Sequence, residues 1–171
     1  MPPFTLLPER AEHGPAIDTL LDHAFGANRQ ERTVYKLRVG APAPGLSFVA
    51  VEGRDFVGSI RFWPVALDRG VGGVLLGPLA VEPHLRGRGI GKALVGHGLA
   101  AAARAGHGLC LVSGDPGYYG PFGFVPAPPL GLELPGPVTD GHFQVKELQP
   151  GWLVLATGLA RLPAGRAERA A

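Results

Sequence analysis

A glycine-rich, basic segment in the middle of the chain has the composition of an anion-binding loop. Residues 86 to 92 read Arg-Gly-Arg-Gly-Ile-Gly-Lys. Glycines let backbone N–H groups approach a ligand without obstruction, and the N–H groups at the start of a helix attract anions. Arg86, Arg88 and Lys92 add positive charge at the same place. The segment therefore predicts a phosphate-binding loop at the N-terminus of a helix.

The spacing of the glycines argues against two common phosphate-binding loops. A P-loop has the pattern Gly-x-x-x-x-Gly-Lys-Ser/Thr, but Arg86 stands where its first glycine should be and Ala93 replaces the hydroxyl. A dinucleotide-binding loop needs Gly-x-Gly-x-x-Gly, and its third glycine would fall on Lys92 or Leu94. A third pattern, Gln/Arg-x-x-Gly-x-Gly/Ala, fits residues 86 to 91 at every fixed position.

A second motif could supply an acid. Residues 113 to 124 read Ser-Gly-Asp-Pro-Gly-Tyr-Tyr-Gly-Pro-Phe-Gly-Phe. Asp115 is a good N-cap and Pro116 suits the first helical position, so a short helix is expected here. Tyr119 falls about one turn into that helix, four residues before the pair Gly123-Phe124.

Together the two motifs resemble the GNAT superfamily of N-acetyltransferases. The acetyl-CoA pyrophosphate loop of that superfamily has the Gln/Arg-x-x-Gly-x-Gly/Ala pattern, and many members carry a tyrosine four residues before a Gly-Phe pair. The Gly-Asp-Pro-x-Tyr-Tyr sequence resembles a bacterial branch of the superfamily. The chain departs from the pattern at Val112, where many members have an asparagine that contacts the coenzyme.

The resemblance implies an acetyl-CoA site made of two consecutive segments. Leu79, Ala80 and Val81 would hold the thioester and the pantetheine arm. The pyrophosphate would bind the loop that follows, which consists of Arg86, Gly87, Arg88, Gly89, Ile90, Gly91 and Lys92. The implied reaction is direct attack of a primary amine on the thioester. The Leu79 N–H would stabilise the oxyanion, and Tyr119 would protonate the departing thiolate.

Several roles stay open. Tyr118 is interpreted as a packing residue, because only Tyr119 has the family spacing. The general base is water or one of four side chains, Glu52, Glu82, His84 and Asp115. One alternative function is a non-catalytic acyl-CoA sensor of the same fold, which would need no acid. The other is a nucleotide-phosphate-binding module. The mismatches with the P-loop and with the dinucleotide-binding loop argue against it.

The strand before the loop contains an interruption. The segment 72 to 81 is almost entirely apolar, which is typical of a buried strand, but Gly77-Pro78 lies within it. Proline cannot donate to a ladder, so pairing must break or bulge there. A bulge would separate this strand from the strand at 108 to 113. An extended pantetheine could then add to the freed edge.

Apolar periodicity predicts the elements that position these motifs. The expected strands cover 4–8, 46–52, 55–67, 72–81, 108–113, 142–148 and 152–158, and the expected helices cover 13–25, 28–37, 89–105 and the turn at Tyr119. This order resembles the whole GNAT fold. The predicted class is α/β (α+β), with a mixed central sheet of about six to seven strands flanked by about four helices. Residues 1 to 160 would form one domain, and residues 161 to 171 a disordered tail.

The composition of the chain restricts its expected partners, metal content and cellular compartment. Its net charge is only +2 and its basic residues are scattered, so no nucleic-acid partner is expected. No apolar run is long enough to span a membrane, and the start is unlike a signal peptide. The single cysteine, Cys110, lies in an apolar run and predicts a buried thiol. The histidines lack metal-ligand spacing, so no metal is expected. These features are compatible with the cytoplasm.

The resemblance also indicates where an acceptor would bind. In this fold the acceptor site is usually built from the first two helices and the loop between the last two strands, here about 25 to 37 and 147 to 152. The acceptor could be a small-molecule or a peptide amine. A homodimer is an expectation from the superfamily alone.

Overall fold

The computed structural model describes residues 3–164, which are organised around a seven-stranded sheet. Its strands lie in the order β1-β2-β3-β4-β5-β8-β6, and only β4 and β5 run parallel. The seven strands are β1 (Thr5–Pro8), β2 (Ser47–Glu52), β3 (Asp55–Ala66), β4 (Gly72–Val81), β5 (Leu109–Ser113), β8 (Phe143–Glu147) and β6 (Val125–Pro126). A separate parallel pair consists of β7 (Leu132–Glu133) and β9 (Gly158–Leu159). The predicted mixed sheet and α+β class are confirmed.

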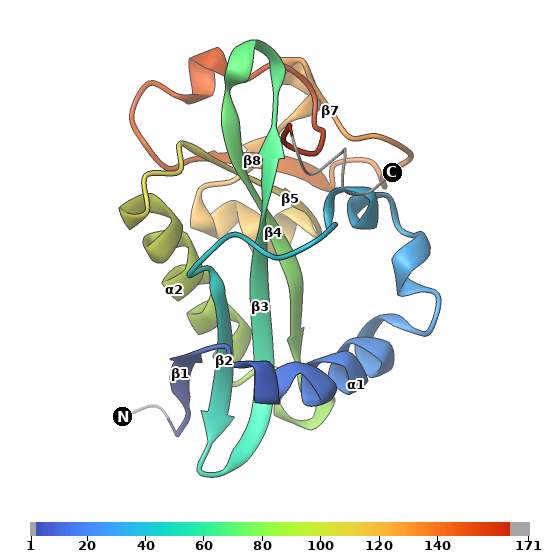
Figure 1. The fold of residues 1–171 in the computed structure, drawn as a ribbon, viewed down its shortest axis with the longest axis vertical. Helices are drawn as coiled ribbons and strands as arrows, with labels where there is room; N and C mark the ends of the chain where they lie inside the picture. Colours follow the sequence, from blue (N-terminus) through green and yellow to red (C-terminus); the bar gives the residue numbers. More distant parts are fainter. Residues whose placement is uncertain (1–2, 165–171) are drawn as a thin grey trace.

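Two helices cover opposite faces of this sheet (Figure 1). They are α1 (Gly14–Phe25) and α2 (Ile90–Arg104). Successive side chains of a strand point to opposite faces, and β2 shows the consequence. Phe48 and Ala50 belong to the buried cluster that contains α2, whereas Val49 belongs to the cluster that contains α1. The connection from β4 through α2 to β5 is the crossover that a parallel pair requires.

The predicted interruption of β4 is a bulge. On β3, Ile60 and Phe62 pair with Leu79 and Leu76 of β4, so β4 contains one extra residue at this point. The bulge shifts the alternation of side chains by one position, so Leu79 packs on the same side of the sheet as Leu76. Pairing of β4 with β5 is confined to the partners of Val74 and Leu75. The last part of β4 therefore has no partner from β5, as the sequence predicted.

Helix α2 packs on the sheet through a face that includes a glycine. Its buried residues are Ile90, Leu94, Val95, Gly98, Leu99 and Ala102. Ala105, where the expected helix 89–105 ended, is the exposed residue that follows the last helical turn. A Cβ atom at Gly98 would collide with the ring of Phe62 on β3, whereas a Cβ at Gly96 would meet nothing within 4 Å. Gly98 therefore lets the helix approach the sheet closely.

These two glycines give a matched pair of stability tests. Gly98→Ala should lower the free energy of unfolding by about 1–3 kcal/mol, because the new methyl group overpacks the core against Phe62. Gly96→Ala should raise it by up to about 1 kcal/mol, because alanine favours the helix and the site is open. Urea unfolding of both variants beside the unchanged chain measures the difference. Equal effects at the two positions would contradict the packing described here.

The expected second helix at 28 to 37 is wrong. The segment forms two 3₁₀ turns, Arg29–Glu31 and Thr33–Leu37, separated by an extended Arg32. Thr33, Val34 and Tyr35 have low helix propensity, which accounts for the short turns. In the described part of the chain the α-helices are α1, α2 and α3 (Pro116–Tyr119), rather than about four.

The C-terminal region also differs from expectation. No strand covers 152 to 158: residues 153–155 form a 3₁₀ turn that leaves Val154 and Leu155 exposed, and only Gly158–Leu159 forms a short strand. The short strands β6 and β7 were not predicted. Arg161, assigned to the tail, forms an antiparallel bridge with Ala66 of β3. Residues 165–171 of that expected tail lie outside the described residues.

Candidate active site

A cavity of about 520 Å³ lies where β4 ends and α2 begins. Its lining contains every residue that the sequence assigned to acetyl-CoA except Arg88, namely Leu79, Ala80, Val81, Arg86, Gly87, Gly89, Ile90, Gly91 and Lys92. Arg88 instead forms an ion pair with Glu52 of β2, with 2.9 Å between Nη2 and Oε1. This pair holds Glu52, one of the candidate bases, outside the cavity lining.

The loop in this cavity has the backbone of an anion-binding site. Gly87 and Gly89 have φ values of 83° and 85°, a left-handed conformation that favours glycine. Gly89 is the N-cap of α2 and no side chain caps the helix, so first-turn N–H groups are left for a ligand. Arg86 and Lys92 are exposed, and the ion pairs among residues 3–164 involve neither of them. Both cations and the helix dipole therefore favour an anion here.

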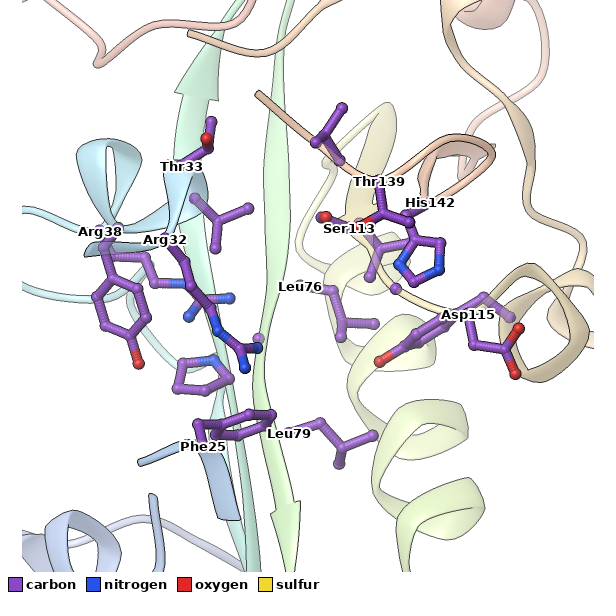
Figure 2. Close-up of a pocket in the computed structure, with 18 of the residues that line it drawn as sticks. Phe25, Arg32, Thr33, Arg38, Leu76, Leu79, Ser113, Asp115, Thr139 and His142 are labelled. Atoms are coloured by element: carbon purple, nitrogen blue, oxygen red, sulfur yellow. The ribbon is translucent and has the colours of Figure 1, made fainter. Parts of the chain in front are cut away.

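A second cavity of about 780 Å³ adjoins the first. Phe25, Leu79 and Tyr118 line both, so the two cavities meet beside the bulged part of β4. Figure 2 shows Arg32 and Arg38 on one side of the second cavity, and Ser113, Asp115 and His142 on the other. A cavity of this size suits a small molecule. The arrangement can hold two reactants in contact at Leu79.

Tyr119 lies in the wall of the second cavity and is only 8% exposed. It ends the short helix α3, which Asp115 caps as predicted: the Gly117 N–H donates to Asp115 Oδ1 at 3.1 Å. The Tyr119 ring packs edge-on against Tyr118 and Phe124. Burial raises the pKa of the Tyr119 hydroxyl, and Tyr118 adds to the rise. The hydroxyl therefore keeps its proton at neutral pH, as a general acid must.

Tyr118 has a more central position than its assigned packing role implies. Its side chain lines both cavities and is half-buried. Its hydroxyl oxygen lies 2.7 Å from the point that a Cβ atom on Gly91 would occupy, so it covers the first turn of α2. Burial raises the pKa of Tyr118 as well. The family spacing singles out Tyr119, whereas Tyr118 is the tyrosine that lines both cavities and Tyr119 lines only the second.

The candidate bases are distributed unevenly around the site. Asp115 lines the second cavity, whereas Glu82 and His84 line neither cavity. His142, which the sequence analysis left without a role, also lines the second cavity. It directly precedes β8, whose first residue, Phe143, pairs with Ser113 at the end of β5. That strand-end position is the sequence signal that could have identified His142.

The two segments that the sequence assigned to the acceptor differ in their relation to the second cavity. The segment from Phe25 to Arg38 contributes one wall of the second cavity, but 147 to 152 contributes none. The latter segment is engaged elsewhere: the Gln149 side chain donates to the Ala103 carbonyl at the end of α2. The rest of the lining comes from 76–79, 112–115, Tyr118, Tyr119, 137–139 and 142.

Three further features of residues 3–164 concern membrane spanning, metal binding and the single cysteine. No helix in this part of the chain has the length and apolar content needed to cross a membrane. Nor does it contain a group of three or more His, Cys, Asp or Glu side chains arranged to hold a metal ion. Cys110 is fully buried on β5, and burial raises the pKa of its thiol. This confirms the buried thiol that the apolar run predicted.

Comparison with known proteins identifies the family. Residues 43–126 match the acetyltransferase (GNAT) domain. The uncharacterized N-acetyltransferase YhbS of Escherichia coli K12 is 34% identical over 147 residues, which cover 85% of this chain and 87% of YhbS. The crystal structure of Escherichia coli YhbS with CoA superposes with a TM-score of 0.79 at 30% identity, covering 94% of this chain and 89% of that one. A Brucella melitensis GNAT acetyltransferase with acetyl-CoA gives 0.71 at 30% identity, covering 94% and 96%. The chain belongs to the GNAT family of N-acetyltransferases.

Proposed function

We propose that this chain transfers the acetyl group of acetyl-CoA to a primary amine by direct attack, with both reactants meeting at Leu79. The observation that carries the proposal is the contact between an anion-binding cavity and a second, small-molecule-sized cavity beside the bulged part of β4, which pairs with β3 but has no partner from β5. Acetyl-CoA would occupy the first cavity and the amine the second. CoA and acetyl-CoA in the complexes of the two related proteins support this assignment.

The residues of the first cavity suit the parts of acetyl-CoA. The N–H groups of the first turn of α2, with Arg86 and Lys92, would bind the pyrophosphate. The free edge of β4 at Ala80 and Val81 would pair with the extended pantetheine arm. The Leu79 N–H would stabilise the negative charge that develops on the thioester oxygen.

The proton transfers involve the second cavity. The amine nitrogen forms a bond to the acetyl carbon while the bond from that carbon to sulfur breaks. Tyr119 would donate its proton to the departing thiolate. The proton released by the amine would pass to water or to a side chain, His142 or Asp115. These two side chains lie across the cavity from Arg38. Histidine is the side chain best suited to take up a proton near neutral pH.

The first test is a calorimetric titration of the purified chain with acetyl-CoA, CoA, ATP and NAD. Acetyl-CoA and CoA should bind with dissociation constants between about 1 μM and 1 mM. ATP and NAD should bind at least about 100-fold more weakly, a difference of about 2.7 kcal/mol. Absence of binding by acetyl-CoA and CoA would contradict the proposal. Preferred binding of ATP or NAD would favour the nucleotide-binding alternative.

A second measurement separates an enzyme from an acyl-CoA sensor. The chain is mixed with acetyl-CoA and a panel of amines, and release of free CoA thiol is followed over time. An acetyltransferase releases thiol in an amine-dependent manner. A sensor binds acetyl-CoA in the titration but releases no thiol with any amine. The first outcome is expected because Tyr119 and His142 lie in the wall of the amine cavity.

A further inference from the structure

Arg38 is an unusual cation in the wall of the acceptor cavity. It follows the 3₁₀ turn Thr33–Leu37 and is partly buried. Its guanidinium carbon lies 4.7 Å from the centre of the Tyr35 ring. Its Nη2 atom lies 2.5 Å from the point that a Cβ atom on Gly77 would occupy. The guanidinium is therefore held between an aromatic ring and the bare backbone of β4, at the bulge.

No acidic side chain of the described residues 3–164 forms an ion pair with this cation. The ion pairs among residues 3–164 do not include Arg38. Its Nε atom is buried and has no hydrogen-bond partner. Burial lowers the pKa of Arg38 to about 10, although the neighbouring Tyr35 and Tyr119 side chains act in the opposite direction, so the group is still charged at neutral pH. Burying a cation without a counterion costs free energy. An anionic ligand would supply the missing counterion, so this environment favours an anionic ligand.

A second arginine lies on the same side of the cavity. Figure 2 shows the Arg32 side chain beside that of Arg38, with Phe25 below it. The Arg32 guanidinium carbon lies 5.0 Å from the centre of the Phe25 ring. The acids that line the cavity, Glu31 and Asp115, pair with neither arginine. This wall of the cavity is therefore cationic, and the opposite wall carries His142 and Asp115.

The position of Arg38 limits the size of the acceptor. The guanidinium rests on Gly77, and Leu79 is two residues further along β4. Two residues of chain span at most about 7 Å. An anion bound to Arg38 and an amine beside Leu79 must therefore belong to a molecule in which only a few carbon atoms separate them. The planar fork of a guanidinium matches a carboxylate with two hydrogen bonds.

We infer that the acceptor is a small amine that carries a carboxylate, an amino-acid-like molecule, whose carboxylate binds Arg38 while its amine faces Leu79 and His142. The inference rests on the proposed acetyl transfer and specifies its substrate class. The amine nitrogen gains the acetyl carbon and loses one proton. Sulfur leaves as the CoA thiol after it takes a proton, and the carboxylate is unchanged. The product is an N-acetylated acid.

The test compares acceptors that differ only in the anion. The chain with acetyl-CoA is assayed for thiol release with the standard amino acids, with the amide of each, with aminoalkyl phosphonates and with spermidine. At least one amino acid should be acetylated with a kcat/KM at least about 100-fold above that of its amide, because the amide leaves Arg38 unpaired. Equal turnover of acids and amides would overturn the inference. Preference for spermidine or for a phosphonate, or no turnover of any amino acid, would also overturn it.

Substitution of the arginine supplies the matching control. Arg38→Met should lower kcat/KM for the preferred acid by at least about 100-fold, and Arg38→Lys should retain part of the activity because it keeps the charge but not the fork. Arg104 is an exposed arginine in the last turn of α2 and lines neither cavity. Arg104→Met should change kcat/KM by less than about 3-fold, within the range of surface changes.

Two measurements distinguish failure of this inference from failure of the proposed function and from misfolding of the variant. The dissociation constant of acetyl-CoA should stay within about 3-fold in Arg38→Met, because Arg38 does not line the coenzyme cavity. If the unchanged chain fails to bind acetyl-CoA, the proposed function fails. If it binds and acetylates amines without regard to a carboxylate, only the inference fails.

The thermal midpoint of Arg38→Met should be unchanged or higher, since an unpaired buried charge is removed. A lower midpoint would indicate a structural role and contradict the inference.

Discussion

Replacing Gly89 by glutamate should weaken acetyl-CoA binding by at least about 100-fold, equivalent to about 2.7 kcal/mol. Gly89 is the N-cap of α2, and a side chain there would meet no protein atom within 4 Å. The carboxylate would thus enter the region where the pyrophosphate is proposed to bind. Two like charges about 4 Å apart repel by about 4 kcal/mol at an effective dielectric constant of about 20. Calorimetric titration with acetyl-CoA measures the loss.

Two variants separate repulsion from distortion of the loop. Gly89 has a φ of 85°, so any side chain costs about 1–2 kcal/mol of backbone strain. Gly89→Ala carries this strain without the charge and should weaken binding by less than about 10-fold, because the strain is shared by free and bound forms. Gly96→Glu puts the same charge on the exposed side of α2, further from the cavity, and should leave binding within about 3-fold. Unchanged binding by Gly89→Glu would refute the proposed pyrophosphate site.

Replacing Tyr119 by phenylalanine should lower kcat by about 100- to 10,000-fold, the usual contribution of a general acid. The ring and its contacts with Tyr118 and Phe124 are kept, so only the hydroxyl is lost. Acetyl-CoA binding should stay within about 3-fold, because Tyr119 does not line the coenzyme cavity. Steady-state kinetics with the best amine from the panel, together with calorimetry, give both quantities.

Tyr118→Phe is the matched control for this substitution. The two tyrosines are adjacent, both carry a raised pKa because of burial, and each variant removes one hydroxyl. If Tyr119 is the acid, Tyr118→Phe should lower kcat by less than about 10-fold. A larger loss in Tyr118→Phe than in Tyr119→Phe would assign the acid to Tyr118, whose hydroxyl covers the first turn of α2. Full activity of both variants would exclude a tyrosine acid.

The pH dependence of kcat gives an independent check on Tyr119. Burial raises the pKa of this hydroxyl above its ordinary value of about 10, so the protonated, active form persists into the alkaline range. Loss of the acid should therefore not reduce kcat below about pH 10. The contradicting result is a decrease in kcat that is centred below about pH 10 and is absent in Tyr119→Phe. Such a decrease would require a Tyr119 hydroxyl that is less buried than in this structure.

Local sequence signals predicted the cavity at the end of β4 and the start of α2, where acetyl-CoA is proposed to bind. Glycines at 87 and 89, cations at 86 and 92 and the apolar strand before them lie within one continuous segment. Their chemistry depends on backbone conformation and near neighbours, which spacing and propensity describe well. For the same reason the bulge at Gly77-Pro78 and the cap at Asp115 could be predicted before any contact was known.

The second cavity, where the acceptor is proposed to bind, was decided by tertiary structure. Arg88 matched the loop pattern, yet Glu52 on another strand pairs with it and takes it out of the cavity lining. Arg38 belongs to no motif in the sequence, and its packing against Tyr35 and Gly77 places it in a cavity wall. His142 joins the site only because β8 pairs with β5.

The expected strand at 152 to 158 failed for a related reason, since its apolar residues find no neighbouring strand and Val154 and Leu155 stay exposed. The amino-acid sequence by itself thus determined the helix, the bulged strand and the anion-binding loop, whose physics is local. Only the tertiary structure decided which charges are paired, which are buried without a partner, and which distant side chains share a cavity, because burial and pairing depend on residues far apart in the chain.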